Sequence, residues 1–143
     1  MKVKVLFVCV HNSARSQMAE ELLRLHGGDR FSVESAGYEP VEKVHPLVVE
    51  AMREKGVDLE NKGTQSVFDA FKDGKAYDYV VTVCEECLQQ GCPFFPYEKE
   101  FLRWSFIDPT KLEGSHEERL EGTRKVRDLI DEKILEFISY VPD

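Results

Sequence analysis

The stretch that decides the fold reads Val3-Lys4-Val5-Leu6-Phe7-Val8-Cys9-Val10-His11-Asn12-Ser13-Ala14-Arg15-Ser16. Its first part, residues 3–9, is mostly apolar and is typical of a buried strand. A short polar loop follows, and residues 14–26 then have the pattern of a helix that ends at Gly27-Gly28. A strand, a tight loop and a helix in this order predict the first unit of an α/β fold.

This loop brings together a thiol and a guanidinium group. Cys9 ends the predicted strand, and Arg15 follows after five intervening residues. Peptide N–H groups, a helix N-terminus and an arginine fork form a cradle for oxyanions. Their positive field stabilises a thiolate, so we expect the pKa of Cys9 to lie below that of a free cysteine. Cys9 is therefore predicted to attack a tetrahedral oxyanion, although a cysteine that ends a core strand can also be inert. The predicted oxyanion-binding residues are Val10, His11, Asn12, Ser13, Ala14, Arg15 and Ser16.

Composition and charge narrow the function further. The chain has 143 residues, of which 42% are hydrophobic, and we interpret residues 1–143 as one domain. The formal net charge of −8 argues against a nucleic-acid or membrane partner, and an anionic substrate then needs a locally positive site. Because no apolar run reaches the length of a membrane span and no signal peptide is apparent, we expect a cytoplasmic protein, and a monomer. Four cysteines in that reducing compartment indicate redox chemistry or a metal before structural disulfides.

The rest of the chain alternates predicted strands and helices. Further strands are expected at residues 31–36, 77–83 and 101–106, and further helices at residues 46–55, 66–72 and 115–139. This alternation predicts a parallel sheet with helices on both faces, in which ligands bind at the carboxyl ends of the strands. Cys9 and Cys84 each end a strand, so they are expected at the same edge if these strands are neighbours. One face of the last helix is expected to carry Leu120, Val126, Leu129, Ile130, Ile134, Phe137 and Ile138.

A second group of cysteines, Cys84, Cys87 and Cys92, follows the third predicted strand. In a redox relay, Cys84 would attack the sulfur of a Cys9 adduct and Cys92 would then attack Cys84, with Cys87 as an alternative second thiol. In a metal site, Cys84 and Cys87 have the spacing of zinc ligands, but no second Cys-x2-Cys pair completes the site. The third interpretation is a set of unreactive core thiols.

The motifs of this chain resemble a known family. Residues 8–20 resemble the anion loop of the low-molecular-weight tyrosine phosphatase superfamily. Within that loop, Ser16-Gln17-Met18-Ala19-Glu20 is similar to the thioredoxin-coupled arsenate reductases rather than to the phosphatases proper. The resemblance continues through Glu34-Ser35-Ala36-Gly37, Val80-Val81-Thr82-Val83-Cys84, Cys92-Pro93 and Trp104-Ser105-Phe106-Ile107-Asp108-Pro109, and covers most of the chain in the same order.

This resemblance implies both an architecture and a reaction. The architecture is an α/β three-layer sandwich with a four-stranded parallel, flavodoxin-like sheet. The reaction is the reduction of arsenate to arsenite by Cys9 and a thiol relay through Cys84 and Cys92. Thioredoxin would return the electrons, and no cofactor is implied.

Asp108 is the candidate general acid. Pro109 keeps this aspartate in an extended conformation, although an Asp-Pro pair is also a common turn. The resemblance implies that Asp108 protonates the leaving oxygen, a contribution of roughly 10²–10⁴-fold. Phosphatases usually carry a tyrosine directly after this pair, whereas this chain has Thr110, which argues against a tyrosine phosphatase.

Other assignments stay open at this stage. A phosphate-monoester hydrolase would use Cys9, Arg15 and Asp108, and a non-enzymatic protein would capture zinc or arsenite with its cysteines. Potassium is a further question, because a site in some relatives corresponds to Asn12, Glu20 and Ser35. Ser66 stands where that site has an aspartate, so no metal is assigned.

Overall fold

The structure is a computed structural model that describes residues 2–84 and 96–142. Four strands alternate with helices, as the sequence predicts, and the boundaries differ from the predicted ones by only a few residues. The elements are β1 (Val3–Cys9), α1 (Arg15–Gly27), β2 (Phe31–Gly37), α2 (Pro46–Arg53), α3 (Val67–Lys72), β3 (Tyr79–Cys84), β4 (Glu100–Phe106) and α5 (His116–Tyr140), with short 3₁₀ turns at Gly28–Arg30 and Pro109–Lys111.

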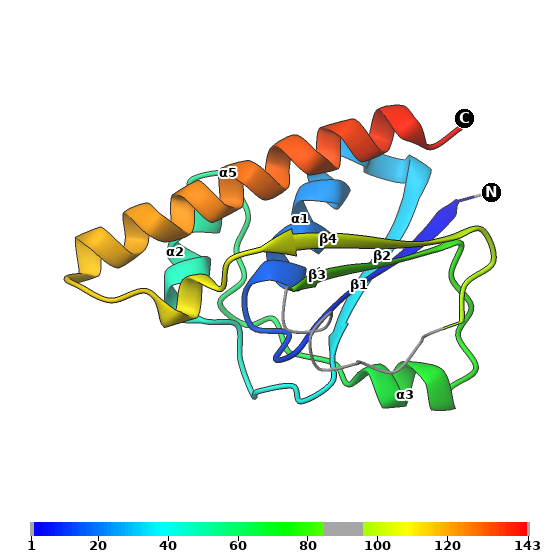
Figure 1. The fold of residues 1–143 in the computed structure, drawn as a ribbon, viewed down its shortest axis with the longest axis horizontal. Coiled ribbons are helices and arrows are strands. Elements are labelled where there is room, and N and C mark those ends of the chain that lie inside the picture. The colour runs from blue at the N-terminus through cyan, green and yellow to red at the C-terminus, as the bar shows by residue number, and fades with distance from the viewer. Residues whose placement is uncertain (1, 85–95, 143) are drawn as a thin grey trace.

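All strand pairs are parallel, and the strand order is β2-β1-β3-β4. Helices α1, α2 and α5 lie on one side of this sheet and α3 lies on the other, which gives three layers (Figure 1). The predicted four-stranded, flavodoxin-like α/β sandwich is therefore confirmed. Within the described residues, no helix is both long and apolar enough to cross a membrane.

Strand β1 is buried on both faces because helices cover both sides of the sheet. Val5 and Phe7 pack into the core shared with α1 and α5, whereas Leu6 and Val8 pack into the smaller core beneath α3. All four side chains are fully buried. This environment explains the continuous apolar run in the sequence, since a strand covered on both sides cannot alternate with polar residues.

Helix α5 departs from the predicted pattern at one position. It begins with a capping box between Ser115 and Glu118, and its buried stripe includes Val126, Ile130 and Ile134. Leu129, however, is 54% exposed, so its predicted place on the buried face is wrong. At 3.6 residues per turn, Leu129 lies about 100° away from Ile130, at the margin of the stripe that meets the sheet.

The strand order places the site. After β1 the chain passes outward to β2, and after β3 it passes outward to β4 on the other side, so the connections diverge at the carboxyl ends of β1 and β3. Ligands of open α/β sheets bind at such a point. Cys9 and Cys84 end these two neighbouring strands, which confirms that they share one edge of the sheet.

Candidate active site

The loop between β1 and α1 is held from outside through its carbonyl groups. The segment that follows β2 donates backbone hydrogen bonds to four of these carbonyls: Tyr38 N–H to Cys9 O at 3.2 Å, Glu39 N–H to Val10 O at 2.7 Å, Val41 N–H to His11 O at 3.1 Å and His45 N–H to Ser13 O at 2.9 Å. The carbonyl of Asn12 accepts from the side-chain amide of Gln17 at 3.0 Å. Five consecutive carbonyl groups of the loop are thus directed away from its centre.

The peptide N–H groups of this loop are consequently directed inward. In a planar trans peptide, the N–H points opposite to the carbonyl of the preceding residue. The N–H of Asn12 shows this direction, because it donates to the sulfur of Cys9 at 3.2 Å. Asn12 itself has a φ of +55°, the left-handed turn that closes the loop. Helix α1 begins at the loop with no side-chain cap and no acidic residue in its first turn, so its positive end faces a bound anion.

Gly37 allows the loop to lie against the end of β2. A Cβ atom at this position would approach Val10 O to 2.6 Å and the backbone nitrogen of Asn12 to 2.9 Å. These are backbone atoms of the anion loop and cannot rotate away. The glycine at residue 37 is therefore required for the close packing of β2 beneath the loop.

The Cys9 thiol is 2% exposed and contacts the hydroxyl of Ser16 at 2.9 Å. Burial raises the pKa of this thiol above its ordinary value, and the nearby Cys84 raises it too, while the Ser16 hydrogen bond and the charge of Arg15 lower the pKa. The expected net lowering of the pKa is therefore wrong, because the effect of burial exceeds that of the hydrogen bond and of the arginine charge. The physical reason is desolvation of the thiolate in a closed core.

Ser16 is oriented to donate to the Cys9 sulfur. The backbone N–H of Gln65 donates to Asn12 Oδ1 at 2.9 Å, which fixes the orientation of the Asn12 amide. Its Nδ2 then donates to Ser16 Oγ at 2.8 Å. Because the Ser16 oxygen already accepts this bond, its own hydrogen is available for the thiolate.

Removing the Ser16 hydroxyl should make Cys9 less reactive. Ser16→Ala deletes a hydrogen bond that lowers the pKa of the thiol, so the thiolate fraction at neutral pH falls. Since a hydrogen bond to a charged group contributes about 1.5–3 kcal/mol, we expect alkylation of Cys9 at pH 7 to slow by roughly tenfold or more. Mass spectrometry of the Cys9 peptide over a pH series measures this, with the exposed Ser32→Ala as control. An unchanged rate would show that Ser16 does not stabilise the thiolate.

Arg15 connects the anion loop to the candidate acid. Its Nη1 donates to the carbonyl oxygen of Phe106 at 3.0 Å, and its Nη2 lies 3.5 Å from Asp108 Oδ2. The side chains of Arg15 and Asp108 are 3% and 8% exposed. The structure thus brings these two predicted site residues together beside the loop.

Thr110 fixes the other oxygen of the candidate acid. Asp108 Oδ1 accepts from the backbone N–H of Thr110 at 2.9 Å and from its hydroxyl at 2.7 Å. Thr110 also lines a cavity of about 360 Å³ beside the anion loop, together with His11, Ser13, Val41, Lys43, Val44, His45 and Pro46. Lys43 places a cationic group on the wall of this cavity, although the chain as a whole is acidic, whereas burial lowers the pKa of His45.

Thr110→Val should lower kcat for the reaction at Cys9. The valine keeps the shape of the side chain but loses the hydroxyl that holds Asp108, so the acid is less well positioned to protonate the leaving oxygen. We expect kcat to fall by roughly fivefold to tenfold with little change in KM, since the oxyanion contacts remain. Steady-state kinetics at several pH values test this. Thr110→Ser should keep the wild-type kcat; a similar loss in both variants would contradict the role of the hydroxyl.

The other predicted thiols divide into one that the structure describes and two that it does not. Cys84 is fully buried at the end of β3, in the same core cluster as Cys9. Cys87 and Cys92 lie outside the described residues. The zinc-ligand spacing of Cys84 and Cys87 and the second step of the relay therefore stay predictions. Among residues 2–84 and 96–142, no three His, Cys, Asp or Glu side chains are grouped as a metal site.

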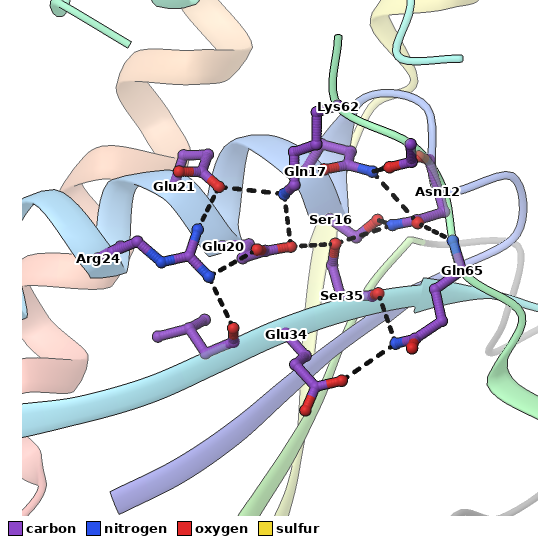
Figure 2. Close-up of polar contacts among 12 residues, drawn as sticks. Asn12, Ser16, Gln17, Glu20, Glu21, Arg24, Glu34, Ser35, Lys62 and Gln65 are labelled. Carbon is purple, nitrogen blue, oxygen red and sulfur yellow. Dashed lines mark hydrogen bonds and ion pairs between the residues drawn. The ribbon is translucent and has the colours of Figure 1, made fainter. Parts of the chain in front are cut away.

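The residues of the hypothetical potassium site are brought together but do not fit a metal ion. Ser35 Oγ donates to Glu20 Oε1 at 2.5 Å and accepts from Asn12 Nδ2 at 3.0 Å. Glu20 Oε1 also binds the ammonium group of Lys62 at 2.7 Å (Figure 2). Ser66, at the position of the missing aspartate, is used as the N-cap of α3.

Some residues around the loop are missed by sequence reasoning. They are the carbonyl-binding segment 38–45, Gln17, Lys62 and Gln65, which support the loop from positions up to 53 residues away in the sequence. No local periodicity predicts such contacts. Only Gly37, within the quoted Glu34-Ser35-Ala36-Gly37 motif, gives a signal in the sequence that a backbone passes close by.

Comparisons with known proteins agree with this geometry. An arsenate reductase of Halalkalibacterium halodurans is 41% identical over 136 residues, which are 95% of each chain. The thioredoxin-dependent arsenate reductase Cg_ArsC1' of Corynebacterium glutamicum superposes with a TM-score of 0.71 at 31% identity; the match covers 97% of this chain and 61% of that one. An arsenate reductase in the phosphate-binding state gives a TM-score of 0.76 at 32% identity, with 99% and 100% of the two chains covered.

The match to a family extends over almost the whole sequence. Residues 4–142 match the low molecular weight phosphotyrosine protein phosphatase family. The three relatives just described, at 31–41% identity, are arsenate reductases, in agreement with the motif Ser16-Gln17-Met18-Ala19-Glu20. The chain therefore belongs to the low molecular weight phosphotyrosine protein phosphatase family, within the group formed by its arsenate reductases.

Proposed function

We propose that this protein reduces arsenate to arsenite with thiol electrons. The observation that carries the proposal is the pair of cysteines at the ends of two adjacent strands, with Cys9 inside the anion loop and Cys84 buried beside it. Val8 pairs with Thr82 in the register, and neighbouring strands lie about 4.8 Å apart, so Cys84 is within one residue of the position opposite Cys9. A hydrolase needs no second thiol at this place.

The first step forms a bond between sulfur and arsenic. Arsenate binds to the inward N–H groups of the loop and to Arg15, whose fork matches two oxyanion oxygens. The positive charge of the loop and the Ser16 hydroxyl favour the Cys9 thiolate, which displaces one oxygen from arsenic. The departing oxygen already carries one proton as an As–OH group, and Asp108 donates the second, so that it leaves as water.

The second step transfers the electrons. The Cys84 thiolate attacks the sulfur of the adduct, and the electron pair of the sulfur–arsenic bond stays on arsenic, which leaves as arsenite. Two thiols are thereby oxidised to the Cys9–Cys84 disulfide, and As(V) gains two electrons. Attack by Cys92 on Cys84 then frees Cys9 and leaves a Cys84–Cys92 disulfide, with Cys87 as the alternative second thiol.

The partners follow from this chemistry. A dithiol protein such as thioredoxin supplies the two electrons that reduce the final disulfide, so no bound cofactor and no metal are required. The resting state needs reduced cysteines, which places the protein in the cytoplasm. We propose that a monomer suffices, because every residue assigned to the reaction belongs to one chain.

Arsenate-dependent NADPH oxidation, with thioredoxin and its reductase supplied in excess, tests the proposal. We expect steady turnover by the wild type and none by Cys9→Ser, with arsenite as the product. Hydrolysis of an aryl phosphate measured in parallel reports on the anion loop alone. Steady phosphatase activity without any arsenate turnover would contradict the proposal.

Phosphate-monoester hydrolysis is a second activity that the site supports. The loop, Arg15 and Asp108 provide the groups that such a reaction uses, and phosphate has the shape and charge of arsenate. Thr110, however, offers no aromatic ring for stacking on a phenyl phosphate. We therefore propose hydrolysis only as a slow side reaction of the reductase.

A further inference from the structure

We infer that Lys62 is a tethered cation that takes the place of a bound metal ion beside the anion loop and positions the hydrogen-bond network that ends at Cys9. The inference concerns Lys62 as a positioning residue. It rests on the proposed function only in taking Cys9 as the reactive thiol. Figure 2 shows the network, which joins α1, β2 and the segment that contains Lys62.

The ammonium group of Lys62 lies between two carboxylates of helix α1. Its Nζ is 2.7 Å from Glu20 Oε1 and 3.1 Å from Glu21 Oε2. The side chains of Glu20 and Glu21 are 7% and 12% exposed, whereas that of Lys62 is 25% exposed. Two carboxylates at this degree of burial need compensating cations. Arg24 pairs with both of them from the same helix, and Lys62 supplies the second positive charge from a different segment.

The polar groups around this position are already in use. Glu20 Oε2 accepts from Arg24 at 2.8 Å, and Glu20 Oε1 accepts from Ser35 as well as from Lys62. Asn12 Oδ1 accepts from the Gln65 backbone at 2.9 Å. A potassium ion would have to displace these donors and lose its own water shell, whereas Lys62 is held in place by the chain.

A cavity of about 200 Å³ adjoins the same groups and shows where a free cation would fit without Lys62. Its walls include Asn12, Gln17, Glu20, Ser35 and Lys62. The side-chain oxygen of Gln17 is buried and has no hydrogen-bond partner among the described residues. With the ammonium group removed, this oxygen and the Glu20 carboxylate are available to a small cation that enters from solution.

The network transmits a fixed hydrogen-bond direction from Glu20 to the thiol. Because Glu20 is a carboxylate, Ser35 must donate to it, and the Ser35 oxygen is then left to accept from Asn12 Nδ2. The second hydrogen of Asn12 Nδ2 goes to Ser16 Oγ. Ser16 then donates to a Cys9 thiolate, so the ammonium group that holds Glu20 in place also supports the thiolate form.

Monovalent cations and Lys62→Ala test the inference together. For the wild type, the melting temperature and the rate of Cys9 alkylation should be the same in potassium, methylammonium and choline chloride at equal ionic strength. Lys62→Ala in choline chloride should melt roughly 3–8 °C lower, because two buried carboxylates lose a partner. Its Cys9 alkylation at pH 7 should slow by roughly threefold to tenfold, since the network that supports the thiolate is loosened.

A small cation should repair this variant. Potassium or methylammonium at about 100 mM is expected to raise the melting temperature of Lys62→Ala by roughly 2–5 °C and to recover part of the alkylation rate. Choline carries its charge on a nitrogen shielded by methyl groups, which has no hydrogen to donate and cannot approach a carboxylate at hydrogen-bond distance, so it should do neither. Lys62→Arg keeps the charge and should resemble the wild type; this variant and the wild-type cation series decide the question if Lys62→Ala does not fold.

Lys75→Ala is the matched control. Lys75 also pairs with a carboxylate next to this cavity, at 3.0 Å from Glu34 Oε1, but both side chains are more than a third exposed. Its removal should change neither the melting temperature nor the alkylation rate by much. A wild type that responds to potassium would overturn the inference, as would a Lys62→Ala variant that behaves as wild type or that no small cation repairs. Because none of these measurements uses arsenate, they remain decisive even if the proposed reductase activity fails.

Discussion

Cys84→Ser abolishes arsenate turnover but leaves the hydrolysis of an aryl phosphate intact: this is the largest effect that we expect. The hydroxyl of serine cannot attack the sulfur of the Cys9 adduct at neutral pH, so arsenite is not released by the relay. We expect arsenate-dependent NADPH oxidation to fall by about 10³-fold or more. The phosphatase activity should stay within about twofold of the wild type, because hydrolysis of a phosphate ester needs no second thiol.

The same assay distinguishes the remaining thiols. Loss of turnover in Cys92→Ser as well as in Cys84→Ser would support Cys92 as the second thiol of the relay, whereas loss in Cys87→Ser would assign that step to Cys87. Mass spectrometry of the inactive Cys92→Ser protein after one turnover should detect the Cys9–Cys84 disulfide. Full arsenate turnover by Cys84→Ser would contradict the relay altogether.

Arg15→Lys is expected to lower kcat/KM by about 10²–10³-fold for arsenate and for an aryl phosphate alike. The guanidinium donates to Phe106 O and lies beside Asp108 Oδ2 with two different nitrogens, so its position is fixed before the oxyanion binds. A single ammonium group cannot keep both contacts and also present a two-pronged donor. Steady-state kinetics on both substrates measure the effect.

Arg127→Lys is the control for this substitution. Arg127 is also almost buried, and its Nη1 donates to Ala51 O at 2.8 Å and to Glu54 at 2.6 Å, far from the anion loop in the contact between α2 and α5. This variant should lose stability and keep its kcat/KM. A protein that only captured arsenite would show no turnover, and Arg15→Lys would leave its arsenite binding unchanged.

Local sequence pattern is sufficient for much of this fold. The apolar run of residues 3–9 requires a strand covered on both faces, and alternating strands and helices require a parallel sheet. Placing Cys9 and Cys84 at one edge needs only that β1 and β3 are neighbours, which the structure confirms. Leu129 shows the limit of such patterns, because helical periodicity cannot tell the centre of a buried stripe from its margin.

The pKa of Cys9, in contrast, does not follow from local sequence pattern. The sequence pattern predicts a lowered pKa for Cys9 from its loop, but the depth of burial raises the pKa instead. Desolvation depends on every atom that covers the thiol, including those of Ser16 and Cys84, and not on the loop residues alone.

The sequence by itself thus determined the order of elements, the anion loop with Cys9 and Arg15, and the family, because these depend on neighbouring residues and on short motifs. The groups that support the conformation of the anion loop are known only from the tertiary structure. Lys62 and Glu21 are 41 residues apart in the chain, and Asn12 and Gln65 are 53 apart. These contacts form when α1 and β2 pack against the segment that contains Lys62 and Gln65. The packing buries polar and charged groups, and each of these must then find a partner.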